Sequence, residues 1–158
     1  MLLRPGDLAP DFDVTDHNGR MLRLSDFRGK KAIVLYFYPK DFTRVCTAES
    51  CGFGEMHGDL LAANIEVVGV SLDSNDSHRR FAKEYGLPFS LVSDGDRGLT
   101  RRYGALSTIR SLLGLAKRVT YVIGFDGRIA GVFEGELSSK PHLEGVRALA
   151  KTLAAKRA

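Results

Sequence analysis

The hydrophobic positions of this chain form short apolar runs that alternate with longer, mixed segments. Two runs, residues 32–38 and 65–71, are largely apolar and rich in β-branched side chains. Such runs are typical of strands that are buried on both faces of a parallel sheet. Three helices are predicted. One follows the first run directly, one spans residues 74–85, and one begins at about residue 139. The alternation predicts one α/β domain that spans residues 1–158.

Shorter elements complete the predicted fold. Two β-hairpins are expected, one around Asn18-Gly19 and one around Asp126-Gly127. The remaining predicted elements are a helical turn at 25–27, a helix at 96–103 and strands at 89–92, 119–123 and 129–133. The side chains predicted to face the core from the two later helices are Phe81, Tyr85, Leu143, Val146, Leu149, Ala150 and Leu153.

Length and composition fit a small globular domain. The chain has 158 residues, of which 44% are hydrophobic, and this is enough for a core. It has no apolar run of membrane-spanning length, and Pro5 interrupts its start too early for a signal peptide. We therefore expect a cytoplasmic protein without a membrane partner. In a reducing compartment, two cysteines are expected to be catalytic or metal-binding rather than a structural disulfide.

The formal charge of +4 is small, but basic residues gather in one stretch. Between Arg97 and Arg118 there are six basic residues and no acidic one. Such a stretch attracts anions or nucleic acid. No nucleic-acid motif accompanies it, so a solvated basic face is favoured and no nucleic-acid partner is expected. The stretch also holds an apolar cluster, for which core packing, lining a site and contacting a partner are open alternatives. Its members are Leu106, Ile109, Leu112, Leu113 and Leu115.

The reactive side chains concentrate just after the first buried run, in residues 39–51, which contain both cysteines. Thr43 is predicted to cap the helix that follows, with Cys46 in its first turn. A thiol there lies near unsatisfied backbone N–H groups and the positive end of the helix dipole, which favour the reactive thiolate. Cys46 is therefore a candidate nucleophile. Cys51 follows closely enough in sequence to trap an oxidised Cys46.

This segment resembles the active site of the peroxiredoxins. Pro39, Thr43 and Cys46 have the spacing of that family's P-x-x-x-T-x-x-C motif. The five-residue step from Cys46 to Cys51 is similar to the bacterioferritin comigratory protein, or peroxiredoxin Q, subfamily, whose resolving cysteine lies in the same helix.

The resemblance extends beyond this motif. Residues 5–12 are similar to the family's entry segment, and residues 117–123 to a later strand whose arginine reaches the active site. The resemblance thus implies that Arg118 lies beside Cys46 and that Glu49 pairs with Arg118. Three segments in the same order are much more specific than one short motif.

The resemblance implies a thioredoxin-like fold of the peroxiredoxin type, with a mixed central β-sheet flanked by helices and an N-terminal β-hairpin. It also implies an antioxidant thiol-dependent peroxidase that reduces hydrogen peroxide and organic hydroperoxides without metal, haem or flavin. In such an enzyme, peroxide oxidises Cys46 to a sulfenic acid and Cys51 condenses with it to a disulfide. A thioredoxin-like dithiol donor then restores both thiols. A monomer or a weak homodimer is expected.

Attack on peroxide also needs donors that orient its oxygens and stabilise the leaving group. The candidates are the Thr43 hydroxyl, the Arg118 guanidinium and the backbone N–H groups of Val45 and Cys46. Pro39 has no N–H group, so it is expected to shape and shield the pocket without competing for substrate.

An intact helix keeps the two thiols apart. Five residues of ideal helix separate two Cα atoms by roughly 8.7 Å, whereas a disulfide needs Cα atoms within about 7 Å. The helix must therefore open before Cys46 and Cys51 can bond. Gly52 and Gly54 each cost about 1 kcal/mol of helix stability relative to alanine, so this segment is predicted to open readily.

Other interpretations are weaker. A zinc site of Cys46, Cys51 and His57 matches no common zinc module. A thiol–disulfide oxidoreductase with a thioredoxin fold is disfavoured because no Cys-x-x-Cys is present. In a non-catalytic thioredoxin-fold binding protein, the thiols would be incidental. The remaining histidines, expected to lie on the surface, are His17, His78 and His142.

Overall fold

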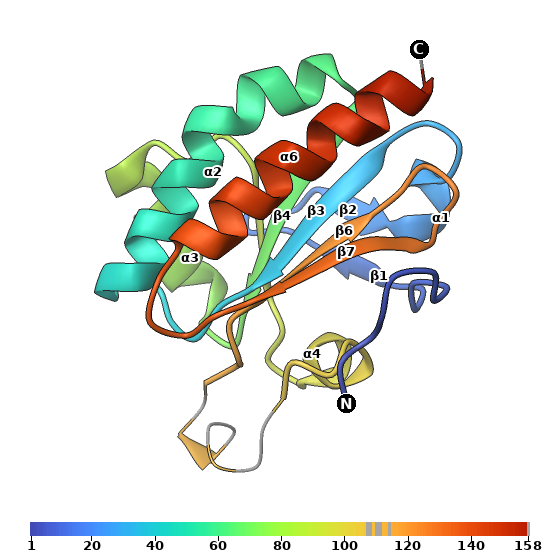
Figure 1. Ribbon diagram of the computed structural model, residues 1–158. Coiled ribbons are helices and arrows are strands. Elements are labelled where there is room, and N and C mark those ends of the chain that lie inside the picture. Colours follow the sequence, from blue (N-terminus) through green and yellow to red (C-terminus); the bar gives the residue numbers. More distant parts are fainter. Residues whose placement is uncertain (107–108, 110–111, 114, 158) are drawn as a thin grey trace.

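The computed structural model describes residues 1–106, 109, 112–113 and 115–157. Within these residues, its central feature is a five-stranded sheet with the strand order β5-β4-β3-β6-β7 (Figure 1). Strand β3 is parallel to β4 and antiparallel to β6, so the predicted mixed sheet is confirmed. The strands are β3 (Ala32–Phe37), β4 (Ile65–Ser71), β5 (Ser90–Ser93), β6 (Val119–Ile123) and β7 (Ile129–Glu134).

Strand β3 shows why its sequence is continuously apolar. All six of its residues are buried, because both faces of the sheet are covered. Ile33, Leu35 and Phe37 belong to the hydrophobic core on one face. Val34 and Tyr36 belong to the core on the other face. This strand therefore joins the two cores and leads directly into the segment with the cysteines.

Helices cover one face of the sheet, and smaller elements cover the other (Figure 1). The first face carries α2 (Arg44–Ala62), α3 (Asn75–Tyr85) and α6 (Lys140–Arg157). The second carries α1 (Leu24–Phe27), α4 (Gly98–Arg102) and the antiparallel hairpin of β1 (Asp13–Thr15) and β2 (Met21–Arg23). No helix in the described ranges combines the length and the apolar character needed to cross a bilayer.

Most predicted elements are confirmed, with ends that match or shift by one or two residues. Helix α3 begins after Ser74, whose side chain accepts a hydrogen bond from the Ser77 N–H, and it ends at Gly86 with a left-handed φ of 61°. In α6, Val146 is buried as predicted. The inward prediction for Tyr85 is wrong, because its side chain is 40% exposed.

The surface prediction for three histidines is also wrong. His17, His78 and His142 are all buried, at 6%, 0% and 0% exposure. Each ring has polar partners that offset the cost of removing it from water, and these partners lie far away in the sequence or on other elements. Hydrophobic periodicity contains no information about such partners, so the sequence pattern assigns these residues to the surface.

The apolar cluster in the basic stretch lies largely in solvent. Ile109, Leu112 and Leu113 are 77%, 83% and 71% exposed, so these three side chains do not pack on the core. Leu106 and Leu115, which flank them, are half-buried. One basic residue of the same stretch, Arg110, lies outside the described residues.

Two glycines offer a matched test of the packing. An alanine Cβ at Gly69 would lie 2.8 Å from the Tyr36 ring and 2.9 Å from Leu91, and Tyr36 is fully buried. Gly69→Ala should therefore lower the free energy of unfolding by about 1–3 kcal/mol through overpacking. At Gly58, on the exposed side of α2, a Cβ would meet nothing within 4 Å, so Gly58→Ala should raise stability by up to about 1 kcal/mol.

Urea unfolding of both variants checks this prediction. Equal stability of Gly69→Ala and the unsubstituted protein would contradict the close packing of β4 against Tyr36. A loss of stability in Gly58→Ala would show that the low helix propensity of this glycine does not limit the stability of α2.

Candidate active site

The N-terminus of α2 presents Cys46 to the end of the central strand. The helix begins at Arg44, so Cys46 is its third residue, and its side chain is fully buried. The first helical hydrogen bond runs from the Thr47 N–H to the Thr43 carbonyl, at 2.8 Å. Helix geometry therefore leaves the N–H groups of the preceding turn without an intrahelical acceptor. The thiol lies in this positive region, as predicted from the sequence.

Sheet register brings Arg118 to the same place. Val119, the first residue of β6, pairs with Phe37, the last residue of β3. Arg118 directly precedes Val119, and α2 follows shortly after Phe37. The guanidinium and the thiol therefore meet where β3 ends and β6 begins. Arg118 Nη2 lies 3.1 Å from Cys46 Sγ.

The guanidinium is buried and almost fully bonded. Arg118 is 4% exposed, and its Nη1 donates to Glu49 Oε1 at 2.9 Å. Its Nε donates to the Glu136 carbonyl oxygen at 3.2 Å, and its backbone N–H donates to Glu136 Oε1 at 3.0 Å. Burial opposes its charge, but Glu49 and Cys46 hold the pKa of Arg118 above its usual value. The expected pairing of Glu49 with Arg118 is present in the structure.

Glu49 and His142 form the inner side of this cluster. Burial raises the pKa of Glu49 to about 7, although Arg118 opposes the rise. Its Oε2 has no hydrogen-bond partner among the described residues and lies 3.4 Å from His142 Nδ1. His142 Nε2 donates to the Gly135 carbonyl at 2.9 Å, and burial lowers the His142 pKa. Ionising Glu49 therefore leaves one carboxylate oxygen poorly compensated.

Thr43 occupies the cap position of α2 without capping it. Its hydroxyl donates to the Lys40 carbonyl at 2.8 Å and makes no bond to the helix, so the predicted side-chain cap is wrong. A hydroxyl has one proton and two lone pairs. Because the hydroxyl proton is bonded to the Lys40 carbonyl, the Thr43 oxygen is an acceptor toward any further partner and not the donor that the sequence analysis expected. Pro39 is buried at the start of this loop, and Val45 is half-buried in the first helical turn.

Cys51 is half-buried in the same unbroken helix as Cys46, and both thiols are free. Burial, reinforced by Glu55, raises the pKa of the Cys51 thiol. Gly52 has a packing role that the sequence did not indicate. A Cβ at this position would lie 2.5 Å from Leu143 Cδ1, so the glycine lets α6 lie close against α2.

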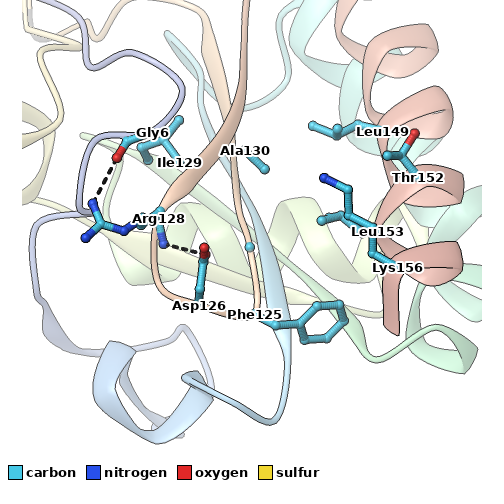
Figure 2. A pocket seen from close by; sticks show the side chains of 11 residues that line it. Gly6, Phe125, Asp126, Arg128, Ile129, Ala130, Leu149, Thr152, Leu153 and Lys156 are labelled. Carbon is cyan, nitrogen blue, oxygen red and sulfur yellow. Dashed lines mark hydrogen bonds between the residues drawn. The ribbon is translucent and has the colours of Figure 1, made fainter. Parts of the chain in front are cut away.

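Figure 2 shows a cavity of about 490 Å³ whose lining includes neither cysteine. It lies between the β6–β7 turn and α6, where Phe125, Leu149 and Leu153 form apolar walls. At its edge Arg128 Nη1 donates to the Gly6 carbonyl at 3.0 Å. Among the described residues, its lining includes no predicted site residue. The buried Cys46 site is thus separate from this cavity.

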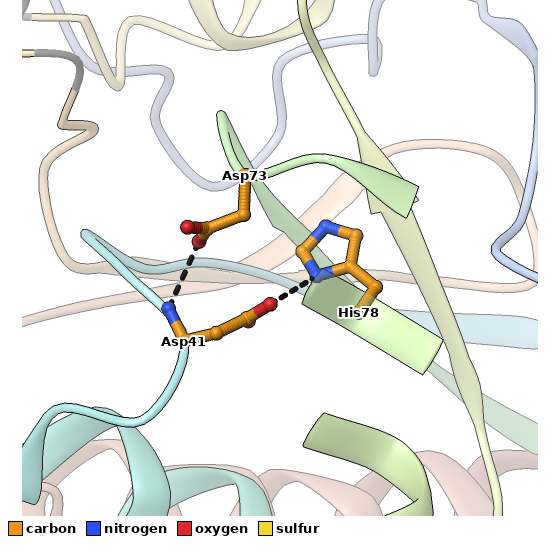
Figure 3. Close-up of side chains that lie close together, drawn as sticks. All are labelled: Asp41, Asp73 and His78. Atoms are coloured by element: carbon orange, nitrogen blue, oxygen red, sulfur yellow. Dashed lines mark hydrogen bonds and ion pairs between the residues drawn. The ribbon is translucent and has the colours of Figure 1, made fainter. Parts of the chain in front are cut away.

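A second polar group involves residues that the sequence analysis left without a role. Asp41, Asp73 and His78 bring oxygen and nitrogen atoms within 4.8 Å of one another (Figure 3). Cys46, Cys51 and His57 form no comparable group within the described part of the chain, so the zinc alternative has no geometric support.

Comparison with known proteins identifies the family. The AhpC/TSA family matches residues 5–132 of the chain. Peroxiredoxin Bcp of Escherichia coli K12 is 35% identical over 144 residues, which are 89% of this chain and 91% of that protein. The chain is a peroxiredoxin of the AhpC/TSA family.

Solved structures agree with this assignment. The crystal structure of peroxidoxin BcpB from Mycobacterium tuberculosis matches with a TM-score of 0.86 at 29% identity, covering 96% of this chain and 98% of that one. The Xanthomonas campestris bacterioferritin comigratory protein, described for alkyl peroxide reduction, gives a TM-score of 0.81 at 28% identity, covering 98% of each chain. The predicted thioredoxin-like fold of the peroxiredoxin type is confirmed.

The activity follows from the family. The enzyme is a thiol-dependent peroxidase, whose substrate is a peroxide and whose oxidised form is restored by a thiol reductant. The two alternatives, a thiol–disulfide oxidoreductase and a non-catalytic binding protein, are not favoured.

The raised pKa of Glu49 predicts a specific pH dependence of stability. This pKa is about 7 in the fold, against an ordinary value of 4.5, so the folded state holds the proton more tightly than the unfolded state. The resulting stabilisation is complete below about pH 4.5 and is lost as the pH rises through 7. From pH 5 to pH 8, the enzyme should lose up to about 3 kcal/mol more unfolding free energy than Glu49→Gln. Denaturant titrations of both proteins measure this difference, and parallel pH profiles would contradict it.

Proposed function

We propose that Cys46 is the nucleophile that attacks the peroxide. The observation that supports this most strongly is the 3.1 Å contact between Cys46 Sγ and Arg118 Nη2 at the start of α2. A buried thiolate is costly unless it is paired and hydrogen-bonded. This site offers it a guanidinium and the positive end of a helix, which are the features that favour a thiolate.

The first step is an exchange of one bond for another. The Cys46 thiolate attacks one peroxide oxygen, a S–O bond forms and the O–O bond breaks. The electron pair of the O–O bond stays on the other oxygen, which takes a proton and leaves as water or an alcohol. Cys46 is oxidised to a sulfenic acid, and the peroxide is reduced.

The neighbouring groups have distinct proposed roles. The Arg118 guanidinium and the N–H groups of the first helical turn, including that of Val45, stabilise the leaving oxygen. The Thr43 hydroxyl accepts a hydrogen bond from the peroxide O–H, because its own proton is held by the Lys40 carbonyl. Pro39 is buried and lacks an N–H group, so it shapes the pocket without competing for the peroxide.

Cys51 completes the cycle in this proposal. Its sulfur attacks the Cys46 sulfenic acid, the hydroxyl group leaves as water and an intramolecular disulfide forms. Because both cysteines lie in one intact helix, their Cα atoms are roughly 8.7 Å apart. Disulfide geometry therefore requires α2 to unwind near its start.

The substrates and partners are proposed from the chemistry and from the relatives. Hydrogen peroxide and organic hydroperoxides both present the O–O bond that the thiolate attacks, and the Xanthomonas campestris relative is described for alkyl peroxide reduction. A thioredoxin-like dithiol supplies the two electrons that reduce the disulfide. We further propose a cytoplasmic enzyme that acts as a monomer or weak homodimer, with residues 1–158 as one domain.

Cys46→Ser tests the nucleophile. This variant should lose peroxide turnover by at least a thousandfold while keeping its fold, because a serine hydroxyl stays protonated near neutral pH. Peroxide consumption with thioredoxin, its reductase and NADPH measures turnover, and circular dichroism checks the fold. Retained activity in a folded Cys46→Ser variant would remove Cys46 from the mechanism.

Hydrogen exchange tests the resolving step. Protection of the backbone amides should fall from about Thr43 to Gly54 when the reduced enzyme is converted to the disulfide, since the bond requires an open helix. In Cys51→Ser, Cys46 should still react once and then stop as a sulfenic acid that is open to further oxidation. A disulfide form in which this segment stays protected would refute unwinding. Mass spectrometry without a Cys46–Cys51 bond would exclude Cys51.

A further inference from the structure

A buried polar pair lies beside the loop that carries the active-site motif. Asp41 is located between Pro39 and Thr43, and its Oδ2 lies 2.7 Å from Nδ1 of His78 on α3 (Figure 3). The two side chains are 1% and 0% exposed. Neither residue has a role in the chemistry proposed for Cys46.

Hydroxyl donors contact both oxygens of the Asp41 carboxyl group. Its Oδ1 accepts from the Tyr38 hydroxyl at 2.6 Å, and its Oδ2 accepts from the Ser77 hydroxyl at 2.8 Å. Both oxygens are thus occupied by neutral donors, in addition to the contact with His78. This is the environment of an ionised carboxylate.

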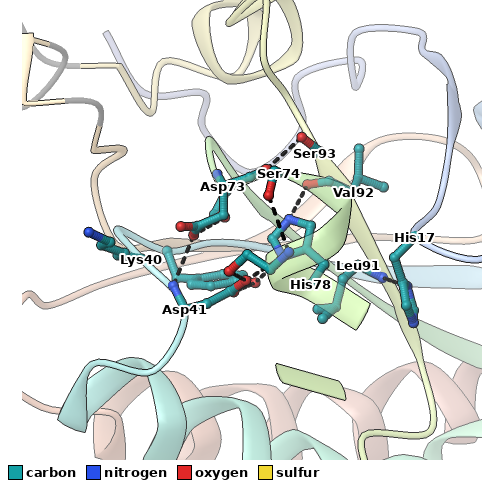
Figure 4. A network of polar contacts seen from close by, with 12 residues as sticks. His17, Lys40, Asp41, Asp73, Ser74, His78, Leu91, Val92 and Ser93 are labelled. Carbon is teal, nitrogen blue, oxygen red and sulfur yellow. Dashed lines mark hydrogen bonds and ion pairs between the residues drawn. The ribbon is translucent and has the colours of Figure 1, made fainter. Parts of the chain in front are cut away.

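The ring of His78 lies between two acceptors. Its Nδ1 contacts the Asp41 carboxylate, and its Nε2 lies 3.2 Å from the Val92 carbonyl oxygen (Figure 4). A carbonyl oxygen cannot donate, so Nε2 carries a proton. If the Asp41 carboxylate also accepts, Nδ1 carries a second proton. The geometry is that of an imidazolium, which donates from both ring nitrogens.

The other titratable groups near the ring suit a cation. The Tyr38 hydroxyl lies 3.4 Å from Nδ1 but gives its proton to Asp41. Asp73 adds a second carboxyl group, which accepts from the Asp41 N–H at 2.9 Å. On the β1–β2 side, His17 Nδ1 accepts from the Leu91 N–H, so this nitrogen carries no proton (Figure 4).

The same hydrogen bonds argue against a metal in this cluster. Asp41 Oδ2 and His78 Nδ1 are 2.7 Å apart, whereas two ligands about 2.1 Å from one tetrahedral ion stand roughly 3.4 Å apart. Asp73 Oδ2 also accepts from the Ser71 hydroxyl at 2.6 Å. The cluster is therefore a hydrogen-bonded network in which both Asp41 oxygens and Asp73 Oδ2 already have donors.

The next residue fixes the same loop from its apolar side. Phe42 has a φ of 67°, a conformation that is unusual for a side chain of this size. Its ring packs against Phe81 and Tyr85 of α3, with centroid distances of 5.1 and 6.4 Å. Such a backbone persists only where the surroundings hold it. Helix α3 thus holds the loop by the contact between His78 and Asp41 and by the aromatic contact.

We propose that the carboxylate of Asp41 and the imidazolium of His78 form a buried ion pair that positions the loop before Cys46 for reaction with peroxide. Both are positioning residues, since they act on the thiol through the backbone of residues 39–43. The proposal rests on the proposed role of Cys46. The ion pair also opposes the unwinding of α2, because an ordered loop favours the intact first turn of the helix.

Nitrogen-15 NMR of histidine-labelled, reduced enzyme tests the charge directly. At pH 7, both ring nitrogens of His78 should show directly bonded protons. The chain has four histidines, and the signals missing from the spectrum of His78→Gln identify those of His78. His17 is an internal control, because its Nδ1 should be bare. A bare ring nitrogen on His78 at pH 7 would overturn the ion pair.

Single-turnover kinetics test the positioning role. Sulfenic acid formation should slow by roughly tenfold or more in Asp41→Asn and in His78→Gln, because small misplacements of reacting groups have large effects on rate. The double variant should be no slower than the slower single variant. Disulfide formation after oxidation should not slow. Ser77→Ala, which removes one donor to Asp41, should show a smaller effect and keeps the test available if the other variants do not fold.

Ser90→Ala is the matched control, since it removes a buried 2.7 Å hydrogen bond to Asp16 outside the loop. It should oxidise like the unsubstituted enzyme. Unchanged oxidation in folded Asp41 and His78 variants would overturn the positioning role, as would equal slowing of the control. If the unsubstituted enzyme itself does not oxidise at Cys46, the proposed nucleophile fails instead, so the two failures are distinguishable.

Discussion

The candidate active site depends on burying the positive charge of Arg118. Removing a guanidinium from water is costly unless it is paired and hydrogen-bonded. Here Glu49, the Glu136 carbonyl and Cys46 surround it at 2.9–3.2 Å. A thiolate at Cys46 would complete this set of partners. The fold can supply these partners because β3 leads into α2 and also pairs with β6. The end of β3 therefore fixes the positions of both the start of α2 and Arg118.

In the proposed cycle, the same arrangement places oxidation of Cys46 and formation of the Cys46–Cys51 disulfide in conflict. The closed start of α2 supplies the positive end of a helix to Cys46, but it also keeps Cys51 beyond bonding distance. Several contacts maintain the closed form. Glu49 pairs with Arg118, the Ser50 hydroxyl lies 2.8 Å from that of Tyr36, and Gly52 allows Leu143 to pack closely. An enzyme of this design must hold the helix firmly enough to react and release it afterwards.

Much of the site was predictable because its determinants are local. The apolar run of β3, the motif spacing and the position of Cys46 in the first turn of a helix all follow from neighbouring residues. Long-range polar partners were not predictable in this way. Asp41 and His78 are 37 positions apart, and Val92, whose carbonyl oxygen contacts the other ring nitrogen, lies on β5. The cap prediction for Thr43 failed for a local reason, since its hydroxyl donates to the Lys40 carbonyl three residues earlier and accepts no hydrogen bond from the helix.

Buried polar pairs thus occur on both sides of Cys46 in the sequence, with Asp41 before it and Glu49 after it. Separating either pair inside the protein would leave an uncompensated charge, so partial release is more costly than complete exposure to water. In the proposed cycle, the loop and the first turns of α2 therefore leave their closed positions together. Because Glu49 takes up a proton more readily than an ordinary carboxyl group, this release is coupled to pH through the same residue that holds Arg118 in place.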